Sequence, residues 1–216
     1  MDEIKHKILF GFPVLVYNVN KKSYDKKSII STIEKNFNEA KVRNKWDKTS
    51  VLHHSYDDLS NPKFSNVNFS SLIPIYEKIL SSMINSMGIS THYKFKFAIV
   101  NYTCLGKAQF MNAHVHEESD FSAIHYIQFD EKNHTPTHFE NTLPHTDFIK
   151  TLRPNLLQIL SNKHLTNSWA FKNWSLDIKE NDFCFFPAYL KHKIDPQTSK
   201  KKNRITVVLN ITLEPK

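Results

Sequence analysis

Three histidines, placed on two stretches of the chain, constrain its fold more than any other feature of the sequence. His114 and His116 are separated by one residue, and a β-rich run follows them. Side chains alternate faces along a strand, so these imidazoles would point the same way, about 6–7 Å apart, and could bind one metal ion. His192 follows the apolar segment 182–187, and Arg204 and Thr206 open another β-rich segment. The sequence therefore predicts a metal site assembled from strands that lie far apart in the chain.

The spacing of apolar residues predicts a mainly β fold with flanking helices. Helical spacing covers 28–40 and 71–87, and in the second segment Ser71 is a candidate cap, Pro74 lies in the first turn and Gly88 ends the helix. A short apolar run over 8–19 predicts an edge strand or a strand pair. Later segments alternate as strands do, over 94–102, 110–116, 121–129, 137–140, 174–178, 182–187 and 204–213. Helices followed by closely spaced strands predict a double-stranded β-helix, or jelly roll, with helices on one side.

The length of 216 residues suits one domain. We expect residues 1–93 to supply a strand and supporting helices, and residues 94–213 to form the jelly-roll core. The segment near 141–173 interrupts the run of strands and reads as an insertion, with a predicted helix over 147–160.

Composition narrows the classes of partner and compartment. The formal net charge is +8, but most of the lysines are scattered, so nucleic-acid binding is not expected. Cys104 and Cys184 lie far apart in the sequence, which favours a reducing compartment over a disulfide scaffold. No signal peptide or membrane-length apolar run is evident, so we expect a cytoplasmic protein.

Taken together, these segments resemble a family of 2-oxoglutarate/iron(II) oxygenases found in phage and marine bacterial genomes and related to prolyl hydroxylases. The segments that carry the resemblance are Ile8-Leu-Phe-Gly-Phe-Pro-Val14, residues 97–102 with Asn101, His114-Val-His116, Ser122-Ala-Ile-His-Tyr126, residues 186–192 and residues 204–210. The chain departs from the family pattern at Ala123, where glycine is usual, and in the long segment 141–173.

The resemblance implies iron(II), 2-oxoglutarate and dioxygen as cofactor and cosubstrates, with His114, His116 and His192 as the iron ligands. Arg204 would bind the distal carboxylate of 2-oxoglutarate through paired hydrogen bonds, and Thr206, on the same strand face, would add a hydroxyl. Asn101 and Tyr126 would line the cosubstrate pocket, with packing as the alternative account of both. The implied reaction hydroxylates an unidentified small-molecule or peptidyl substrate and releases succinate and CO2.

The residues leave the third iron ligand open. Most enzymes with this chemistry use two histidines and a carboxylate, and His116 with Glu118 also has the two-residue spacing. Asp120 lies in a loop from which it could also reach the metal in either arrangement. The three-histidine set is favoured because a predicted strand precedes His114, whereas residues 117–120 read as a polar turn.

Two other functions use the same fold. A cupin-like metalloprotein also carries His-x-His on a jelly roll but needs no 2-oxo acid, and Arg204-x-Thr206 argues against it. A non-catalytic jelly-roll binding protein would bind iron without forming succinate.

Overall fold

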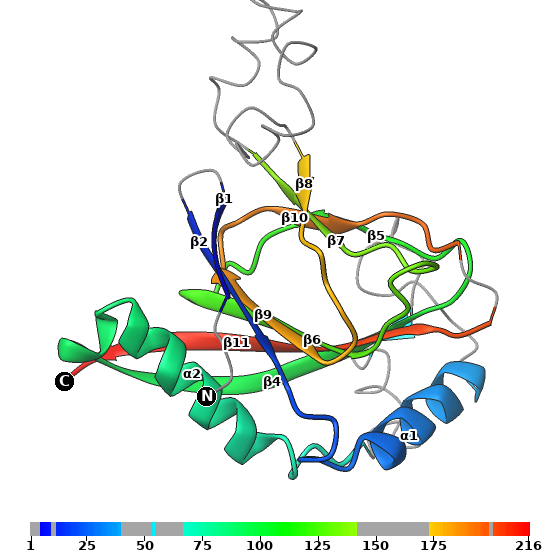
Figure 1. The fold of residues 1–216 in the computed structure, drawn as a ribbon, viewed down its shortest axis with the longest axis horizontal. Coiled ribbons are helices and arrows are strands. Elements are labelled where there is room, and N and C mark those ends of the chain that lie inside the picture. The colour runs from blue at the N-terminus through cyan, green and yellow to red at the C-terminus, as the bar shows by residue number, and fades with distance from the viewer. Residues whose placement is uncertain (1–4, 10–11, 40–52, 55–66, 142–172, 199–200) are drawn as a thin grey trace, which may run out of the picture.

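The computed structural model describes residues 5–9, 12–39, 53–54, 67–141, 173–198 and 201–216 (Figure 1). Within these residues the elements are, in order, β1 (Lys5–Leu9), β2 (Phe12–Asn18), α1 (Lys26–Glu39), β3 (His53–His54), α2 (Ile73–Ser86), the 3₁₀ helix η2 (Ile89–Thr91), β4 (Tyr93–Leu105), β5 (Met111–His114), β6 (Phe121–Gln128), β7 (Thr137–Glu140), β8 (Asn173–Ser175), β9 (Asp182–Pro187), β10 (His192–Ile194) and β11 (Arg204–Pro215). The predicted insertion over 141–173, with its helix over 147–160, falls almost wholly outside the described residues.

In the described part of the chain the strands form two antiparallel sheets. The larger sheet has the order β1-β2-β9-β6-β11-β4-β3, and the smaller sheet has the order β5-β10-β7-β8. Figure 1 shows the smaller sheet facing one side of the larger sheet, while α1 and α2 cover the other side. This is the predicted jelly roll with helices on one side.

The helices form where apolar side chains recur at helical spacing. Ile29 and Ile33 of α1, with Tyr76, Leu80 and Met83 of α2, are buried against the larger sheet. The predicted cap of α2 is wrong, because Leu72 occupies the cap position and makes no side-chain cap bond. The hydroxyl of Ser71 instead accepts a hydrogen bond from the backbone N–H of Asp25, at 3.3 Å. Gly88 follows the helix with φ of 73°, a left-handed conformation that suits glycine.

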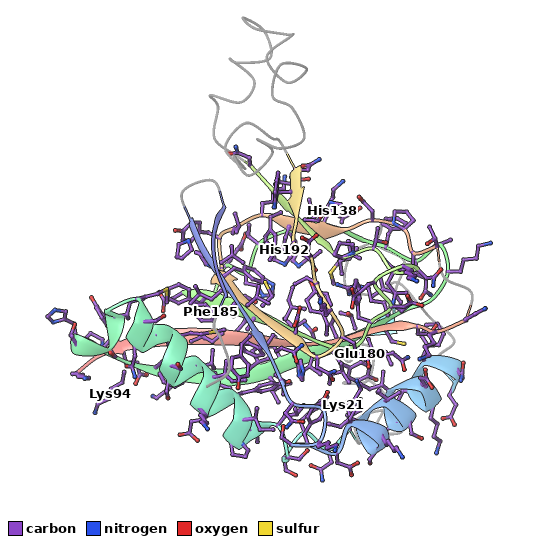
Figure 2. The ribbon with its side chains drawn as sticks, viewed as in Figure 1. Lys21, Lys94, His138, Glu180, Phe185 and His192 are labelled. Atoms are coloured by element: carbon purple, nitrogen blue, oxygen red, sulfur yellow. The ribbon has the colours of Figure 1, made fainter. Side chains whose placement is uncertain are left out.

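A second apolar layer fills the space between the two sheets. It includes Ile124, Tyr126, Phe139 and Phe186, whose side chains point from both sheets toward one another. Figure 2 shows side chains filling this layer and the layer under the helices. Neighbouring residues of a strand therefore serve different layers, and on β6 His125 packs toward the helices while Tyr126 packs between the sheets.

The predicted strand pair over 8–19 is present, and the segment after β9 contains a short additional strand. The apolar run over 8–19 forms most of a hairpin, β1 with β2, in which β1 is the edge strand. His192 opens the short strand β10, which the sequence did not predict, and pairs with His114 of β5. None of the helices among the described residues is long and apolar enough to cross a membrane.

Candidate metal centre

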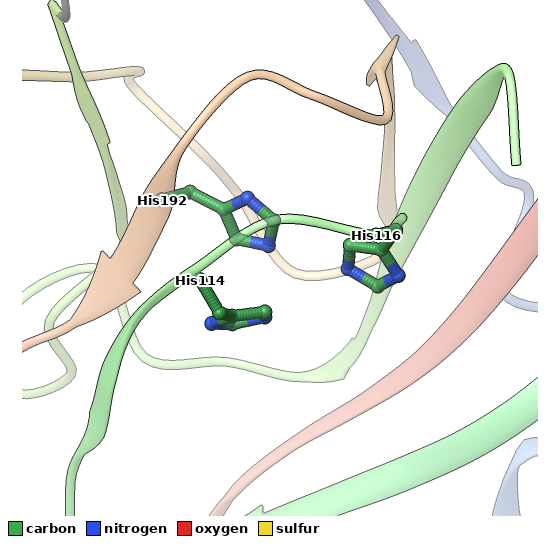
Figure 3. A group of neighbouring side chains, drawn as sticks. All are labelled: His114, His116 and His192. Carbon is green, nitrogen blue, oxygen red and sulfur yellow. The ribbon is translucent and has the colours of Figure 1, made fainter. Parts of the chain in front are cut away.

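His114, His116 and His192 meet between the two sheets. Their candidate ligand atoms all lie within 4.8 Å of one another, although the residues come from segments almost 80 positions apart. His114 ends β5 and His192 begins β10, and the two residues are direct partners across that strand pair. His116 lies two residues beyond His114, where its backbone N–H donates to the carbonyl of Ala188 at 2.9 Å. Figure 3 shows the three rings grouped together.

One ring nitrogen of each histidine forms a hydrogen bond with an oxygen acceptor. Nδ1 of His114 lies 2.9 Å from the carbonyl of Asn112, and Nδ1 of His192 lies 2.8 Å from the carbonyl of Leu190. Nδ1 of His116 lies 2.9 Å from Oδ1 of Asn210. Because oxygen acceptors require a proton on Nδ1, each neutral ring has its lone pair on Nε2. Nε2 is therefore the nitrogen through which each of the three rings could bind a metal.

Burial favours the neutral form of His116 and His192, which is the form that binds a metal. It lowers the pKa of His192 well below the ordinary value, and the nearby His114 and His116 lower it further. Burial also lowers the pKa of His116, although its hydrogen bond with Asn210 works in the opposite direction. Nε2 of His116 is buried and has no hydrogen-bond partner in the described structure. A lone pair buried in this way fits a metal ion, so the residues present suit the metal that the sequence predicts.

A cavity of about 300 Å³ joins the histidines to the residues predicted to bind an acid. One wall is the face of β11 that carries Arg204, Thr206, Val208 and Asn210, as the alternation of a strand requires. The paired strand β4 adds Thr103 opposite Thr206 and Asn101 opposite Val208. The remaining lining residues are Met111, His114, Val115, His116, Glu117, Glu118, Ile124, His192 and Ile194.

Arg204 is completely buried at this cavity. Its Nη2 donates to the hydroxyl of Thr137 at 3.1 Å, and its guanidinium lies 5.0 Å from the ring centre of Tyr126. Nε and Nη1 are buried without a hydrogen-bond partner, and no carboxylate in the described residues forms an ion pair with the group. Burial lowers the pKa of Arg204, partly offset by Tyr126. A buried cation with free donors is costly unless an anion occupies the cavity.

The other predicted cosubstrate residues lie close to Arg204 but differ in their exposure to the cavity. Thr206 lines the cavity, and its hydroxyl lies 2.7 Å from the hydroxyl of Thr103. Asn101 also lines it, and its Oδ1 is buried without a partner in the described structure. Tyr126 packs behind Arg204, and its hydroxyl donates a hydrogen bond to Thr137. Its ring therefore supports Arg204 but is not part of the cavity lining.

The two carboxylates considered as alternative ligands lie apart from the histidine group. Glu118 is exposed on the cavity wall and is not among the residues whose ligand atoms converge. Oδ2 of Asp120 accepts a hydrogen bond from the backbone N–H of Leu213 at 2.7 Å. The geometry thus groups three histidines and leaves both carboxylates outside that group.

Sequence reasoning assigned no role to two residues that contact this site. Asn210 holds His116, and its position could have been inferred, because it continues the two-residue spacing from Arg204 and Thr206. Thr137 holds Arg204 from the smaller sheet. Nothing in the local sequence around Thr137 indicates that contact.

The fold and the site define an antiparallel jelly-roll protein with a three-histidine group beside a buried arginine. A family model described as "Putative 2OG-Fe(II) oxygenase" matches residues 101–210. The match spans half of the chain and includes His114, His116, His192 and Arg204. The chain belongs to this family of 2-oxoglutarate/iron(II) oxygenases, as its sequence predicts. No curated protein sequence matches the chain.

Solved structures show the same fold at low sequence identity. The viral collagen prolyl hydroxylase of Paramecium bursaria Chlorella virus-1, solved with 2-oxoglutarate, aligns with a TM-score of 0.52 and 14% identity over 92% of this chain and 94% of that chain. A prolyl-4-hydroxylase from Pseudomonas putida gives a TM-score of 0.50 and 9% identity over 98% and 94% of the two chains. A 2OG-Fe(II) oxygenase family oxidoreductase from Burkholderia pseudomallei gives only 0.45 at 6% identity, over 66% of this chain and 57% of that chain. The likeness to the two prolyl hydroxylases confirms the jelly-roll fold.

Proposed function

We propose that the protein is an iron(II)- and 2-oxoglutarate-dependent hydroxylase with His114, His116 and His192 as the metal ligands. One observation carries the proposal: three histidines with converging ligand atoms share a cavity with a buried arginine whose Nε and Nη1 have no partner in the described structure. Bound iron(II) would supply oxidative chemistry, in which 2-oxoglutarate and dioxygen are converted to succinate and CO2 as a substrate C–H bond is hydroxylated.

The chain's own residues bind and orient in this proposal. Arg204 forms paired hydrogen bonds with the distal carboxylate of 2-oxoglutarate through Nε or Nη1, which have no partner in the described structure, together with the second hydrogen of Nη2. Thr206, one strand repeat further along, adds a hydroxyl contact, and Asn101 completes the wall beside it. The apolar side chains of Met111, Ile124 and Ile194 exclude water from the same cavity.

The metal ligands are tested by iron titration without oxygen. His192→Ala should abolish stoichiometric iron(II) binding while the circular dichroism spectrum is unchanged. His92→Ala, which removes an exposed histidine remote from the group, is the matched control and should bind iron as the wild type does. Unchanged affinity in a folded His192→Ala protein would remove this residue from the site.

The cosubstrate assignment is tested by calorimetry with 2-oxoglutarate on the anaerobic iron-loaded protein. Losing one partner of a buried charge pair costs about 2–5 kcal/mol, so Arg204→Ala should weaken binding about thirty-fold or more. Lys107→Ala removes an exposed positive charge away from the cavity and should leave the affinity unchanged. Equal affinity in the Arg204→Ala and wild-type proteins would instead favour a cupin-like metalloprotein.

The substrate is then sought by succinate formation from 2-oxoglutarate over a library of peptides, amino acids and small metabolites. Two solved structures with this fold are named as prolyl hydroxylases, so proline-containing peptides come first in that library. A substrate raises succinate formation above the rate without it and gains one oxygen atom, which mass spectrometry detects. An iron-bound protein that never forms succinate would favour a non-catalytic binding role.

A further inference from the structure

The hydroxyl oxygen of Thr137 accepts two hydrogen bonds at the edge of the candidate site. Nη2 of Arg204 donates to it at 3.1 Å, and the hydroxyl of Tyr126 donates to it at 2.7 Å. Thr137 begins β7 of the smaller sheet, whereas Arg204 and Tyr126 lie on β11 and β6 of the larger sheet. All three residues are at most 1% exposed. One side chain of the smaller sheet therefore holds the arginine of the larger sheet.

These contacts restrict the guanidinium in two independent ways. An arginine has only donors, and the tyrosine hydroxyl donates, so both lone pairs of the threonine oxygen are used as acceptors. The hydrogen bond fixes the direction of Nη2 within the plane of the guanidinium. The Tyr126 ring, 5.0 Å from the guanidinium carbon, limits the tilt of that plane. In the described structure Nε and Nη1 have no partner, and either of them can form a fork with the second hydrogen of Nη2.

Orientation matters because a carboxylate is bound by a planar fork of donors. Paired hydrogen bonds require the guanidinium and the carboxylate to be coplanar, and a freely rotating arginine loses side-chain entropy when it binds. An arginine already fixed by Thr137 and Tyr126 has lost that freedom before the ligand arrives, so ligand binding is tighter. Thr137 itself is not among the residues that line the cavity and acts only through Arg204.

We propose that Thr137 is a positioning residue that pre-orients Arg204 for the distal carboxylate of the 2-oxo acid. This inference rests on the proposed function, in which Arg204 binds that carboxylate. It assigns to Thr137 a specific part in discriminating between 2-oxo acids. Ligands with a distal carboxylate should depend on Thr137, and ligands without one should not.

The test compares two ligands in Thr137 variants by anaerobic calorimetry on the iron-loaded protein. Thr137→Val keeps the side-chain shape but removes the acceptor, and it should weaken 2-oxoglutarate binding about ten-fold. Binding of 2-oxobutyrate, which lacks the distal carboxylate, should be unchanged, as should iron affinity. Thr137→Ser keeps the hydroxyl and should bind 2-oxoglutarate as the wild type does. A purely structural role of Thr137 would weaken both ligands equally and would overturn the inference.

A double variant separates the arginine contact from the tyrosine contact. Thr137→Val leaves the buried Tyr126 hydroxyl without its acceptor, which destabilises the fold. Tyr126→Phe combined with Thr137→Val removes that orphan hydroxyl, so the melting temperature should recover toward the wild type. The loss of 2-oxoglutarate affinity should persist, because Arg204 still lacks its acceptor. Recovery of affinity together with stability would overturn the inference.

Failure of the proposed function gives a different result. If the wild type binds 2-oxoglutarate no more tightly than 2-oxobutyrate, Arg204 does not bind the distal carboxylate, and the proposed function fails at that step. If the wild type prefers 2-oxoglutarate but the Thr137→Val protein keeps that preference, only the role of Thr137 is wrong.

Discussion

Nδ1 of His116 lies 2.9 Å from the side-chain oxygen of Asn210, on the strand that also carries Arg204. The other two histidines of the group donate from Nδ1 to backbone carbonyls, which no substitution can remove. In the described part of the chain, the Nδ1 of His116 is therefore the one that is held by a side chain. Because Asn210 continues the face of Arg204 and Thr206, a single strand carries both of these residues and the side chain that holds His116.

Asn210 should control metal affinity through His116. Substituting the outer partner of a ligating histidine typically costs about 10–100-fold in metal affinity, and we expect Asn210→Ala to weaken iron(II) binding within that range. Asn210→Asp keeps an oxygen acceptor and adds a negative charge, so it should bind iron at least as tightly as the wild type. Anaerobic competition titrations against a chromophoric chelator measure all three affinities.

A matched control for this comparison is Asn85→Ala, which removes an exposed asparagine of α2. It should leave iron affinity unchanged. If Asn210→Ala also binds iron as tightly as the wild type, the hydrogen bond to His116 does not support the metal site.

The third metal ligand can be decided by one pair of variants. The histidine group contains His114 and leaves Glu118 exposed on the cavity wall, so His114→Ala should lose iron and Glu118→Ala should retain it. The same anaerobic titration measures both proteins. The opposite result would establish His116 and Glu118 as the ligand pair and would require the segment after β5 to adopt another conformation when iron is bound.

Both thiols should be unreactive in the folded protein. Cys104 and Cys184 are completely buried, and burial raises the pKa of Cys184. Because the thiolate is the reactive form, a thiol reagent such as DTNB should label neither residue in buffer and both in denaturant. Rapid labelling of the native protein would contradict the burial of these residues.

The sequence predicted the fold well because periodicity reports directly on which face a residue occupies. Strand β9 and the helix α2 were found almost at their predicted bounds, since their apolar residues follow a clear period. The cap of α2 was missed because the Ser71 hydroxyl is used by Asp25, in a contact between segments distant in sequence. Strand β10 was missed because three residues are too few to show a period.

Prediction of the site was limited by contacts between the sheets. Alternation places Arg204, Thr206 and Asn210 on one face, and that much can be read from the chain. The contact of Arg204 with Thr137 depends on how the smaller sheet packs against the larger one and on the register of β7 against β10, which pairs Thr137 with Ile194. Neither is encoded in a local pattern, so the residues that hold the arginine could be found only in the structure.

His125 is a buried histidine outside the site, on the helix-covered face of the larger sheet. Its Nδ1 lies 2.8 Å from the hydroxyl of Tyr76, and the ring tautomer decides which of the two groups donates the hydrogen bond. Its Nε2 is buried without a partner in the described structure. The ring of Tyr24 packs edge-on against the ring of His125. Burial, with a smaller effect of Lys26, lowers the pKa of His125 from 6.5 to about 3. The folded protein therefore holds this ring neutral in mild acid.

This shift should make the free energy of unfolding fall as the pH decreases below 6.5. Between the unfolded pKa of 6.5 and the folded pKa of about 3, the unfolded chain binds a proton at His125 that the folded chain does not bind. The contribution of the neutral His125 ring to the free energy of unfolding is fully present above pH 6.5. About 2 kcal/mol of it is lost between pH 6.5 and 5. His125→Asn retains an oxygen acceptor for Tyr76 but cannot be protonated, so its denaturant-measured stability should fall less steeply over this range. The control His92→Asn removes an exposed histidine and should keep the wild-type slope of stability against pH. Equal slopes for His125→Asn and the wild type would show that His125 does not set the acid sensitivity.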